Sequence, residues 1–312
     1  MTAETDLSRA HEQAARLAEE SARAGGVHLR TVEAVAPLAA VADYFSDVWR
    51  TPRSSPPLPA EVLHSLVHAG GAVHAAYTVD EGRLAGACAA VFGPPAEAEA
   101  YSLVAAADRG LGHAVKQAQR AWLLGRGART LRWTFDPLVA RNARFNLVKL
   151  GATGTEYLVD FYGPMADGVN DGDESDRLAV TWDLVAPRGP SSAPVTPAGP
   201  DDGPVTPAGP DDRPATPAGP DDRPVTPAGP DDRPVAVTTA PDGGPLVCRS
   251  LDDRFVWCRV PEDVVALRAA DPVLALRWRH AVREVFTKAF AEGFAATGMS
   301  RDGWYTLTRE EA

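Results

Sequence analysis

The stretch YSLVAAADRGLGHAVK, residues 101–116, combines a strand, a glycine turn and the start of a helix. It begins as an apolar run, turns at Gly110 and Gly112, and continues with helical periodicity to Leu124. Glycines let the backbone turn with its N–H groups converging, and the first turn of a helix presents unpaired amides and the positive end of its dipole. The stretch therefore predicts a turn that binds phosphate groups.

The flanking segments predict a mixed α/β fold with a largely antiparallel, twisted sheet and helices on both faces. Three antiparallel strands precede the turn, so the unit is not a dinucleotide-binding βαβ, and no GxxxxGK[ST] motif is present. The expected helices span residues 6–24, 37–50, a segment after Pro59, 112–124 and 138–150. The expected strands span residues 27–32, 73–79, 84–92, 101–106, 130–135, 156–162 and 178–184.

A ten-residue unit rich in proline and aspartate is repeated four times over residues 194–233. Its prolines remove hydrogen-bond donors and its charges resist burial, so the sequence predicts an extended, disordered linker over residues 188–245. The expected organisation is an N-terminal helix (1–26), a core domain (27–187), this linker, and a C-terminal β-α-β-β extension (246–312). The extension comprises a strand at 255–260, a helix that begins at Pro272 with Asp271 as its cap, and a closing hairpin at 294–307.

Charge and composition exclude several classes of protein. The formal net charge is −11 and we find no basic run, so nucleic acid is not an expected partner. No apolar segment has the length of a membrane span or a signal peptide, so we expect a cytoplasmic protein. The three cysteines lack metal or redox spacing, and His64 and His68 are the one histidine pair at ligand spacing on a helix, so no metal is expected.

The glycine turn resembles the acyl-CoA-binding motif of the GNAT superfamily of N-acetyltransferases, written [RQ]-x-x-G-x-[GA]. Gly110 and Gly112 match its glycines, whereas Ala107 stands where arginine or glutamine is usual. The run DPLVARNARFNLVKLG, residues 136–151, is similar to a DPL…RNA…KLGA run in a bacterial branch of that superfamily. The resemblance covers the element order of residues 27–165 and implies acyl-CoA, acetyl-CoA or another, as co-substrate.

By that resemblance, the fourth strand splays from the fifth, and the pantetheine arm of CoA hydrogen-bonds into the gap much as an added strand would. The pyrophosphate lies on the glycine turn. The residues implied for CoA are Leu103, Val104, Ala105, Arg109, Gly110, Leu111, Gly112, His113, Asn142 and Asn146. The two asparagines share a helical face, and their alternative is a polar surface role. Exposure to solvent is the alternative for His113.

Acyl transfer to an amine requires a base, a group that stabilises the oxyanion, and an acid for the leaving thiolate. Many members of the superfamily supply the acid with a tyrosine four residues before a helix-ending glycine, but here that position is Leu147. Tyr157 and Tyr162 are the nearest substitutes, with packing on a strand as their alternative. Asp136 could hold the substrate ammonium or act as a base through water, and its alternative is the N-cap of the next helix.

Ser175 and Arg177 follow a polar loop. An arginine there suits a substrate carboxylate, and the alternative is a turn with a surface ion pair. The resemblance implies an acyl-CoA-dependent N-acyltransferase that moves an acetyl or succinyl group to a small-molecule amine or amino acid. A catalytically inactive acyl-CoA-binding or interaction module is the main alternative, and a protein acyltransferase is a third. A homodimer is compatible with each.

Overall fold

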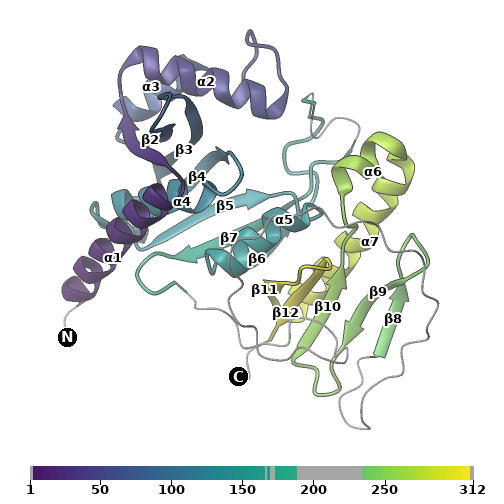
Figure 1. Cartoon of the computed structure of the whole chain (residues 1–312). Helices are drawn as coiled ribbons and strands as arrows, with labels where there is room; N and C mark the ends of the chain where they lie inside the picture. Colours follow the sequence, from purple (N-terminus) through teal and green to yellow (C-terminus); the bar gives the residue numbers. More distant parts are fainter. Residues whose placement is uncertain (1–2, 166, 169–172, 188–234, 310–312) are drawn as a thin grey trace.

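The chain was studied as a computed structural model, which describes residues 3–165, 167–168, 173–187 and 235–309 (Figure 1). These residues form one twelve-stranded sheet in the order β1-β2-β3-β4-β5-β7-β6-β11-β12-β10-β9-β8. All the strand pairs are antiparallel except β4 with β5. The expected fold class, a largely antiparallel sheet with helices on both faces, is confirmed.

The elements before residue 188 follow the expected order. They are α1 (Ala3–Ala24), β1 (Val27–Val32), α2 (Val35–Trp49), α3 (Ala60–His68), β2 (Ala72–Thr78), β3 (Leu84–Phe92), a 3₁₀ turn (Pro95–Glu97), β4 (Glu99–Ala107), α4 (Gly112–Leu124), β5 (Thr130–Phe135), α5 (Ala140–Ala143), a π-helix (Arg144–Lys149), β6 (Thr153–Leu158) and β7 (Arg177–Asp183).

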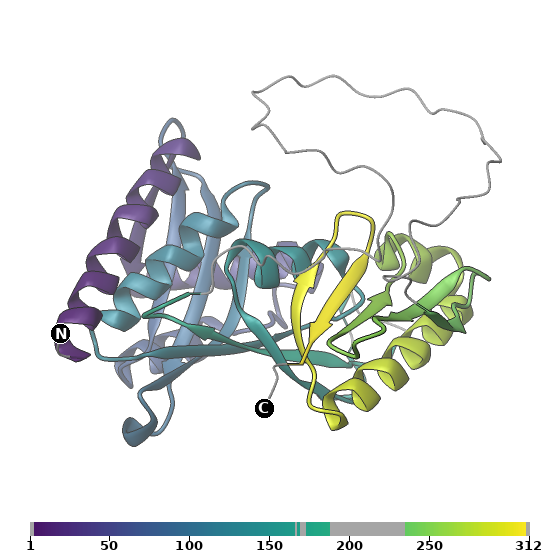
Figure 2. The same ribbon diagram turned by 90° about the horizontal axis from the view of Figure 1, so that it is seen from below.

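The two faces of this half of the sheet are covered by different helices. On one face, α1 and α4 run alongside each other (Figure 2). Ala22, Leu111 and Val115 of this face pack on strand residues such as Ala76. On the other face, α2 and α3 place Leu38, Val41, Phe45 and Leu63 against Val73, Ala75, Ala87 and Ala89. Small alanines dominate the strands, so the helices pack close to the sheet on both sides.

The C-terminal extension continues the same sheet. It contains β8 (Val235–Thr239), β9 (Pro245–Arg249), β10 (Phe255–Arg259), α6 (Val264–Ala270), α7 (Pro272–Ala291), β11 (Ala295–Met299) and β12 (Trp304–Thr308). It joins the first half where β11 pairs with β6, through the single residue pair Ala296 and Gly154. Asp271 caps α7 as expected, since its carboxylate accepts a hydrogen bond from the N–H of Leu274 at 2.9 Å.

The structure differs from the expected elements in both halves of the chain. The expected helix over 138–150 is a short α-helix followed by a π-helix, and the strand expected over 156–162 ends at Leu158. Strands β8 and β9 and helix α6 were not expected. Strand β8 falls inside the segment assigned to the linker, whereas the four repeats lie outside the described residues. Among the described helices, none is long and apolar enough to cross a membrane.

Candidate functional site

The parallel pair β4 and β5 splits after three residue pairs, of which Tyr101 with Arg132 is the last. Beyond it, β4 continues along β3 to the pair Gly86 with Ala107, and β5 continues along β7 to the pair Phe135 with Leu178. The two strands therefore diverge into a wedge that widens toward the glycine turn. Within the described part of the chain, no strand pairs with the β5-facing edge of β4 along this stretch.

A β-bulge marks the start of the unpaired edge. Ala89 of β3 faces Val104, and the next residue, Ala90, faces Ser102, so Leu103 is the extra residue. Bulges are common beside active sites, where they redirect a strand. Leu103 is 39% exposed. The structure thus places Leu103, Val104 and Ala105, the residues expected along the pantetheine, on the open edge of β4.

The glycine turn forms the wide end of the wedge. Gly110 has a φ of 90°, a left-handed conformation that favours glycine, and a side chain there would point into open space. Helix α4 begins at Gly112 after Leu111, and no described side chain caps it. Its first amides therefore have no partner within the helix, as an anion-binding terminus requires. Arg109 is exposed at the same turn.

His113 is half-buried rather than exposed. Its Nδ1 lies 2.8 Å from Oγ of Ser21, and its Nε2 lies 3.2 Å from Nε2 of Gln117. Oε1 of Gln117 accepts a hydrogen bond from Arg120, so its amide nitrogen is the donor toward His113. Burial and the charges of Lys149 and Arg120 lower the pKa of His113. The imidazole is therefore neutral near pH 7 and joins α4 to α1.

Lys116 lies at the point of the wedge, on the α4 side. Its Nζ donates to Oγ of Ser102 at 2.9 Å and to Oε1 of Gln119 at 3.1 Å, and lies 4.2 Å from the ring centre of Trp133. Ser102 and Trp133 are the first residues of β4 and β5 after the last pair. Burial lowers the pKa of Lys116 to about 8. The sequence reasoning did not select this residue.

Three hydroxyl groups meet on the opposite side of the same point. Tyr162 and Thr134 lie 3.2 Å apart through their oxygens. Burial raises the pKa of Tyr101, and side-chain hydrogen bonds with Thr134 and Tyr162 act on it in opposite directions. Tyr162 lies in a turn after β6 and is 51% exposed to solvent. We call Tyr101, Thr134 and Tyr162 the hydroxyl cluster.

Asp136 lies in a buried ion network. It accepts two hydrogen bonds from Arg279, at 3.0 and 3.1 Å, and also pairs with Arg268. Its carboxylate also accepts a hydrogen bond from the N–H of Leu138 at 2.9 Å, in the turn before α5. The N-cap of that helix is Val139, so the expectation that Asp136 is the N-cap is wrong. Burial opposes its ionisation, but Arg279 and Arg268 outweigh that effect and lower its pKa. These contacts are those of a structural carboxylate, and a carboxylate with a lowered pKa is a weak base.

Tyr157 belongs to the same network. Its hydroxyl donates to Oδ2 of Asp176 at 2.8 Å, and Asp176 also pairs with Arg283 at 2.7 Å. Burial, together with the charge of Asp176, raises the pKa of Tyr157. Its ring packs on Phe286 of α7 at 5.5 Å. The two tyrosines that the sequence offered as acids, Tyr157 and Tyr162, therefore lie in different environments.

Arg177 lies beside the hydroxyl cluster, whereas Ser175 shapes the loop that leads to it. The guanidinium of Arg177 is 5.2 Å from the ring centre of Tyr162, and its Nη2 donates to Sδ of Met165. Oγ of Ser175 accepts from the N–H of Tyr162 at 2.9 Å and donates to Asp160 at 3.1 Å. Asn142 is exposed on α5, while Asn146 is buried in the π-helix.

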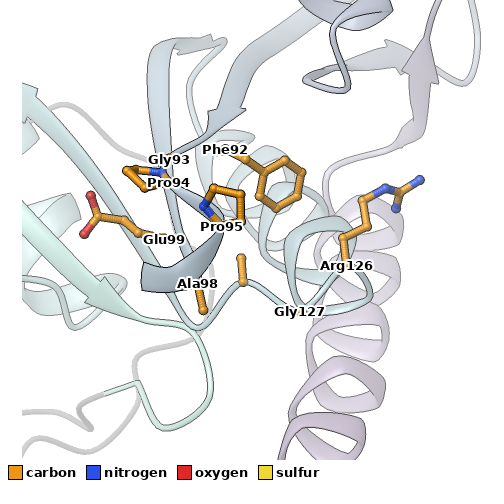
Figure 3. A pocket seen from close by; sticks show the side chains of 9 residues that line it. Phe92, Gly93, Pro94, Pro95, Ala98, Glu99, Arg126 and Gly127 are labelled. Carbon is orange, nitrogen blue, oxygen red and sulfur yellow. The ribbon is translucent and has the colours of Figure 1, made fainter.

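Two surface hollows flank this region without containing the predicted CoA residues along β4. One, of about 510 Å³, includes Tyr44, Arg83 and Asp108 and adjoins the glycine turn. The other, of about 410 Å³, lies where β4 begins and is lined by Phe92, two prolines, Glu99 and Arg126 (Figure 3). No group of three metal-ligating side chains occurs among the described residues.

Comparison with known proteins gave matches among solved structures alone. No family model and no curated protein matches the chain. Three of the similar structures are an N-acetyltransferase from Staphylococcus aureus Mu50 (14% identity, TM-score 0.41, 51% of this chain and 98% of that one), a ribosomal-protein-S5-alanine acetyltransferase from Vibrio fischeri (11%, 0.42, 52% and 96%), and yncA from Salmonella typhimurium with its cofactor acetyl-CoA (13%, 0.40, 54% and 99%). Each likeness extends over about half of this chain.

Proposed function

We propose that this chain is an acyl-CoA-dependent N-acyltransferase that acts on the amine of a small molecule. The observation that carries the proposal is the wedge between β4 and β5, with a glycine turn at its wide end and the hydroxyl cluster at its point. A strand edge beside a helix N-terminus suits a ligand that combines amides with phosphates. CoA has both in one molecule.

Different residues of the chain would bind the pantetheine and the pyrophosphate of CoA. The open edge of β4 at Leu103, Val104 and Ala105 offers backbone groups to the two amides of pantetheine. The amides at the start of α4 and the exposed guanidinium of Arg109 are available to the pyrophosphate. A thioester bound in this direction ends at the point of the wedge.

The reaction at that point joins an amine to the acyl carbon. The neutral amine attacks the thioester carbonyl and the carbon–sulfur bond breaks. The new amide nitrogen loses one proton to solvent, and the departing thiolate takes a proton from the acid. Tyr162 is our candidate for the acid because its hydroxyl is exposed and belongs to the hydroxyl cluster. We assign positioning roles to Asp136 and Tyr157. The carboxylate of Asp136 is paired with arginines, and the hydroxyl of Tyr157 donates its hydrogen bond to Asp176.

Arg177 directs the choice of amine. Its guanidinium lies over the Tyr162 ring at 5.2 Å, so a carboxylate bound there would place a nearby amine beside the hydroxyl cluster. An amino acid carries both a carboxylate and an amine. We therefore propose an amino acid as the acceptor.

The test is a thiol-release assay with acetyl-CoA and succinyl-CoA against a panel of amines and amino acids, together with calorimetric binding of CoA. Binding and turnover on amino acids are expected. Binding without turnover on any acceptor would favour the inactive acyl-CoA-binding module, and the buried leucine at position 147 is the observation in its favour. Labelling of lysines in a protein mixture would favour a protein acyltransferase. The absence of CoA binding would exclude all three.

A further inference from the structure

Two buried cations lie one turn apart on the sheet-facing side of α4. Lys116 is 4% exposed and Arg120 is 1% exposed. Among the described residues no carboxylate forms an ion pair with either, although the more distant Asp183 slightly favours the charged form of Arg120. Buried charges in proteins are normally paired, because removing an ion from water has a large free-energy cost.

The surroundings of these cations contain more donors than acceptors. Arg120 donates to the carbonyl oxygen of Leu184 at 2.8 Å and to Oε1 of Gln117 at 3.3 Å, which leaves its Nη2 without a partner. Nε2 of Gln119 and Nε1 of Trp182 are also buried without partners. We call Lys116, Gln119, Arg120 and Trp182 the donor cluster.

Contacts join the donor cluster into one layer between α4 and the sheet. Lys116 contacts Gln119 and the Trp133 ring, Trp133 packs edge-on against Trp182 at 6.2 Å, and Arg120 lies 5.8 Å from the Trp182 ring centre. Burial lowers the pKa of Lys116 to about 8 and that of Arg120 to about 10, which shows how poorly the protein compensates the two charges. An anion bound beside them would restore the balance.

The position of Lys116 indicates which anion that is. Its hydrogen bond to Ser102 and its contact with Trp133 place it between the first unpaired residues of the two diverging strands. On the proposed function, the acyl group reaches this point. An acetyl group supplies no formal charge there, whereas an acyl group with a terminal carboxylate supplies one.

We propose that the donor cluster recognises a carboxylate at the free end of the acyl group, so that the co-substrate is the CoA thioester of a short dicarboxylic acid. This inference rests on the proposed function. It assigns Lys116 to specificity for the acyl group, and Arg120 and Gln119 to the support of the same carboxylate.

The experiment compares pairs of thioesters that differ by one charged group. Malonyl-CoA and butyryl-CoA, and succinyl-CoA and pentanoyl-CoA, each differ by the replacement of a carboxylate with an ethyl group. Calorimetry should show that the wild-type chain binds the charged member of at least one pair tenfold or more tightly. Lys116→Gln should abolish the preference, Lys116→Arg should retain part of it, and Lys288→Gln, at an exposed lysine of α7, should leave it unchanged.

Three outcomes would overturn the inference. The first is that the wild type binds the two thioesters of each pair with equal affinity. The second is that Lys116→Gln weakens the binding of both members of a pair equally. The third is that mass spectrometry detects covalent acylation of Lys116. The wild-type comparison decides the question even if the variants fail to fold. A chain that binds CoA but does not discriminate within the pairs contradicts this inference alone, whereas a chain that binds no CoA contradicts the proposed function.

Discussion

Arg279 holds Asp136 with both of its terminal nitrogens, at 3.0 and 3.1 Å, across 143 positions of sequence. The same guanidinium donates to Asp173 at 2.6 and 3.0 Å. Helix α7 is thereby joined to the carboxyl end of β5 and to the segment before β7. Strands β11 and β6 share a single register pair, and this network adds polar contacts between the two halves, as do the ion pairs of Arg283 with Glu174 and Asp176.

Removal of that guanidinium should destabilise the protein strongly. Arg279→Met leaves two buried carboxylates without their principal partner, and such losses cost about 3–5 kcal/mol. Arg277→Met changes an exposed arginine of the same helix and should cost less than about 0.5 kcal/mol. Urea unfolding of both variants measures the difference. Equal stabilities would show that the network contributes little.

Acid should weaken the same network. The pKa of Asp136 is lowered in the folded chain, because its arginine partners outweigh the effect of burial. Its contribution is therefore complete above the unfolded pKa of about 3.9 and is lost as pH falls through the folded value. Unfolding free energies between pH 7 and pH 2 should fall more steeply for the wild type than for Asp136→Asn. Parallel curves would contradict the assignment.

Substitution of Gly110 should weaken CoA binding in addition to lowering stability. Valine there must adopt a φ of 90° and would place a side chain where we locate the pyrophosphate. Gly127→Val is the matched control, because Gly127 has a φ of 87° and open space beside it, at the end of α4 away from the turn. Both variants should lose roughly 1–3 kcal/mol of stability. Calorimetry should show at least a tenfold loss of CoA affinity for Gly110→Val alone.

Tyr162→Phe should separate chemistry from binding. Loss of its hydroxyl removes the proposed acid, so kcat should fall by about 100-fold, within the usual range for such catalysis, while the affinity for CoA stays the same. Tyr77→Phe alters a tyrosine of β2 that packs under Arg30 and should leave both quantities unchanged. If Tyr162→Phe retains full kcat, the acid lies elsewhere.

Lys116 should give the stability of the protein a distinct dependence on alkaline pH. Its pKa is about 8 when folded and 10.5 ordinarily, so between these values the unfolded chain binds a proton that the folded chain lacks. The wild type should therefore gain stability relative to Lys116→Met as pH rises from 8 to 10.5, by on the order of 3 kcal/mol. Chemical unfolding at several pH values tests this. A stability difference between the wild type and Lys116→Met that does not change with pH would show that folding does not lower the pKa of Lys116.

Local patterns were sufficient to predict most of the first half of the fold. The strands at 27–32, 84–92 and 130–135 and the helix at 112–124 agree with the structure, because each has a clear period and ends at glycine, proline or a polar turn. Strand β8 was missed because its short Val-Ala-Val-Thr-Thr run follows the repeats directly. The π-helix could not be predicted, because the helical periodicity of the sequence continues unchanged to Leu150.

The site was harder to predict because it depends on register. The resemblance implies that the fourth strand separates from the fifth, but no local pattern shows that the separation begins after Tyr101 and Arg132 or that Thr134 lies beside Tyr162. In the sequence, Lys116 is one charged residue on a predicted helix. Its contacts with Ser102 and Trp133 follow only from the packing of that helix on the sheet.

The long-range arginine network also has a consequence for the synthesis of the chain. Arg268, Arg279 and Arg283 follow the carboxylates that they neutralise by 95 to 143 positions. At about 5–20 residues per second, a ribosome would produce the first half roughly 5 to 30 s before its counter-charges. Nascent chains of this protein are therefore expected to remain incompletely folded until α7 emerges from the ribosome. Chains whose synthesis stops before that point should be preferred substrates for proteolysis.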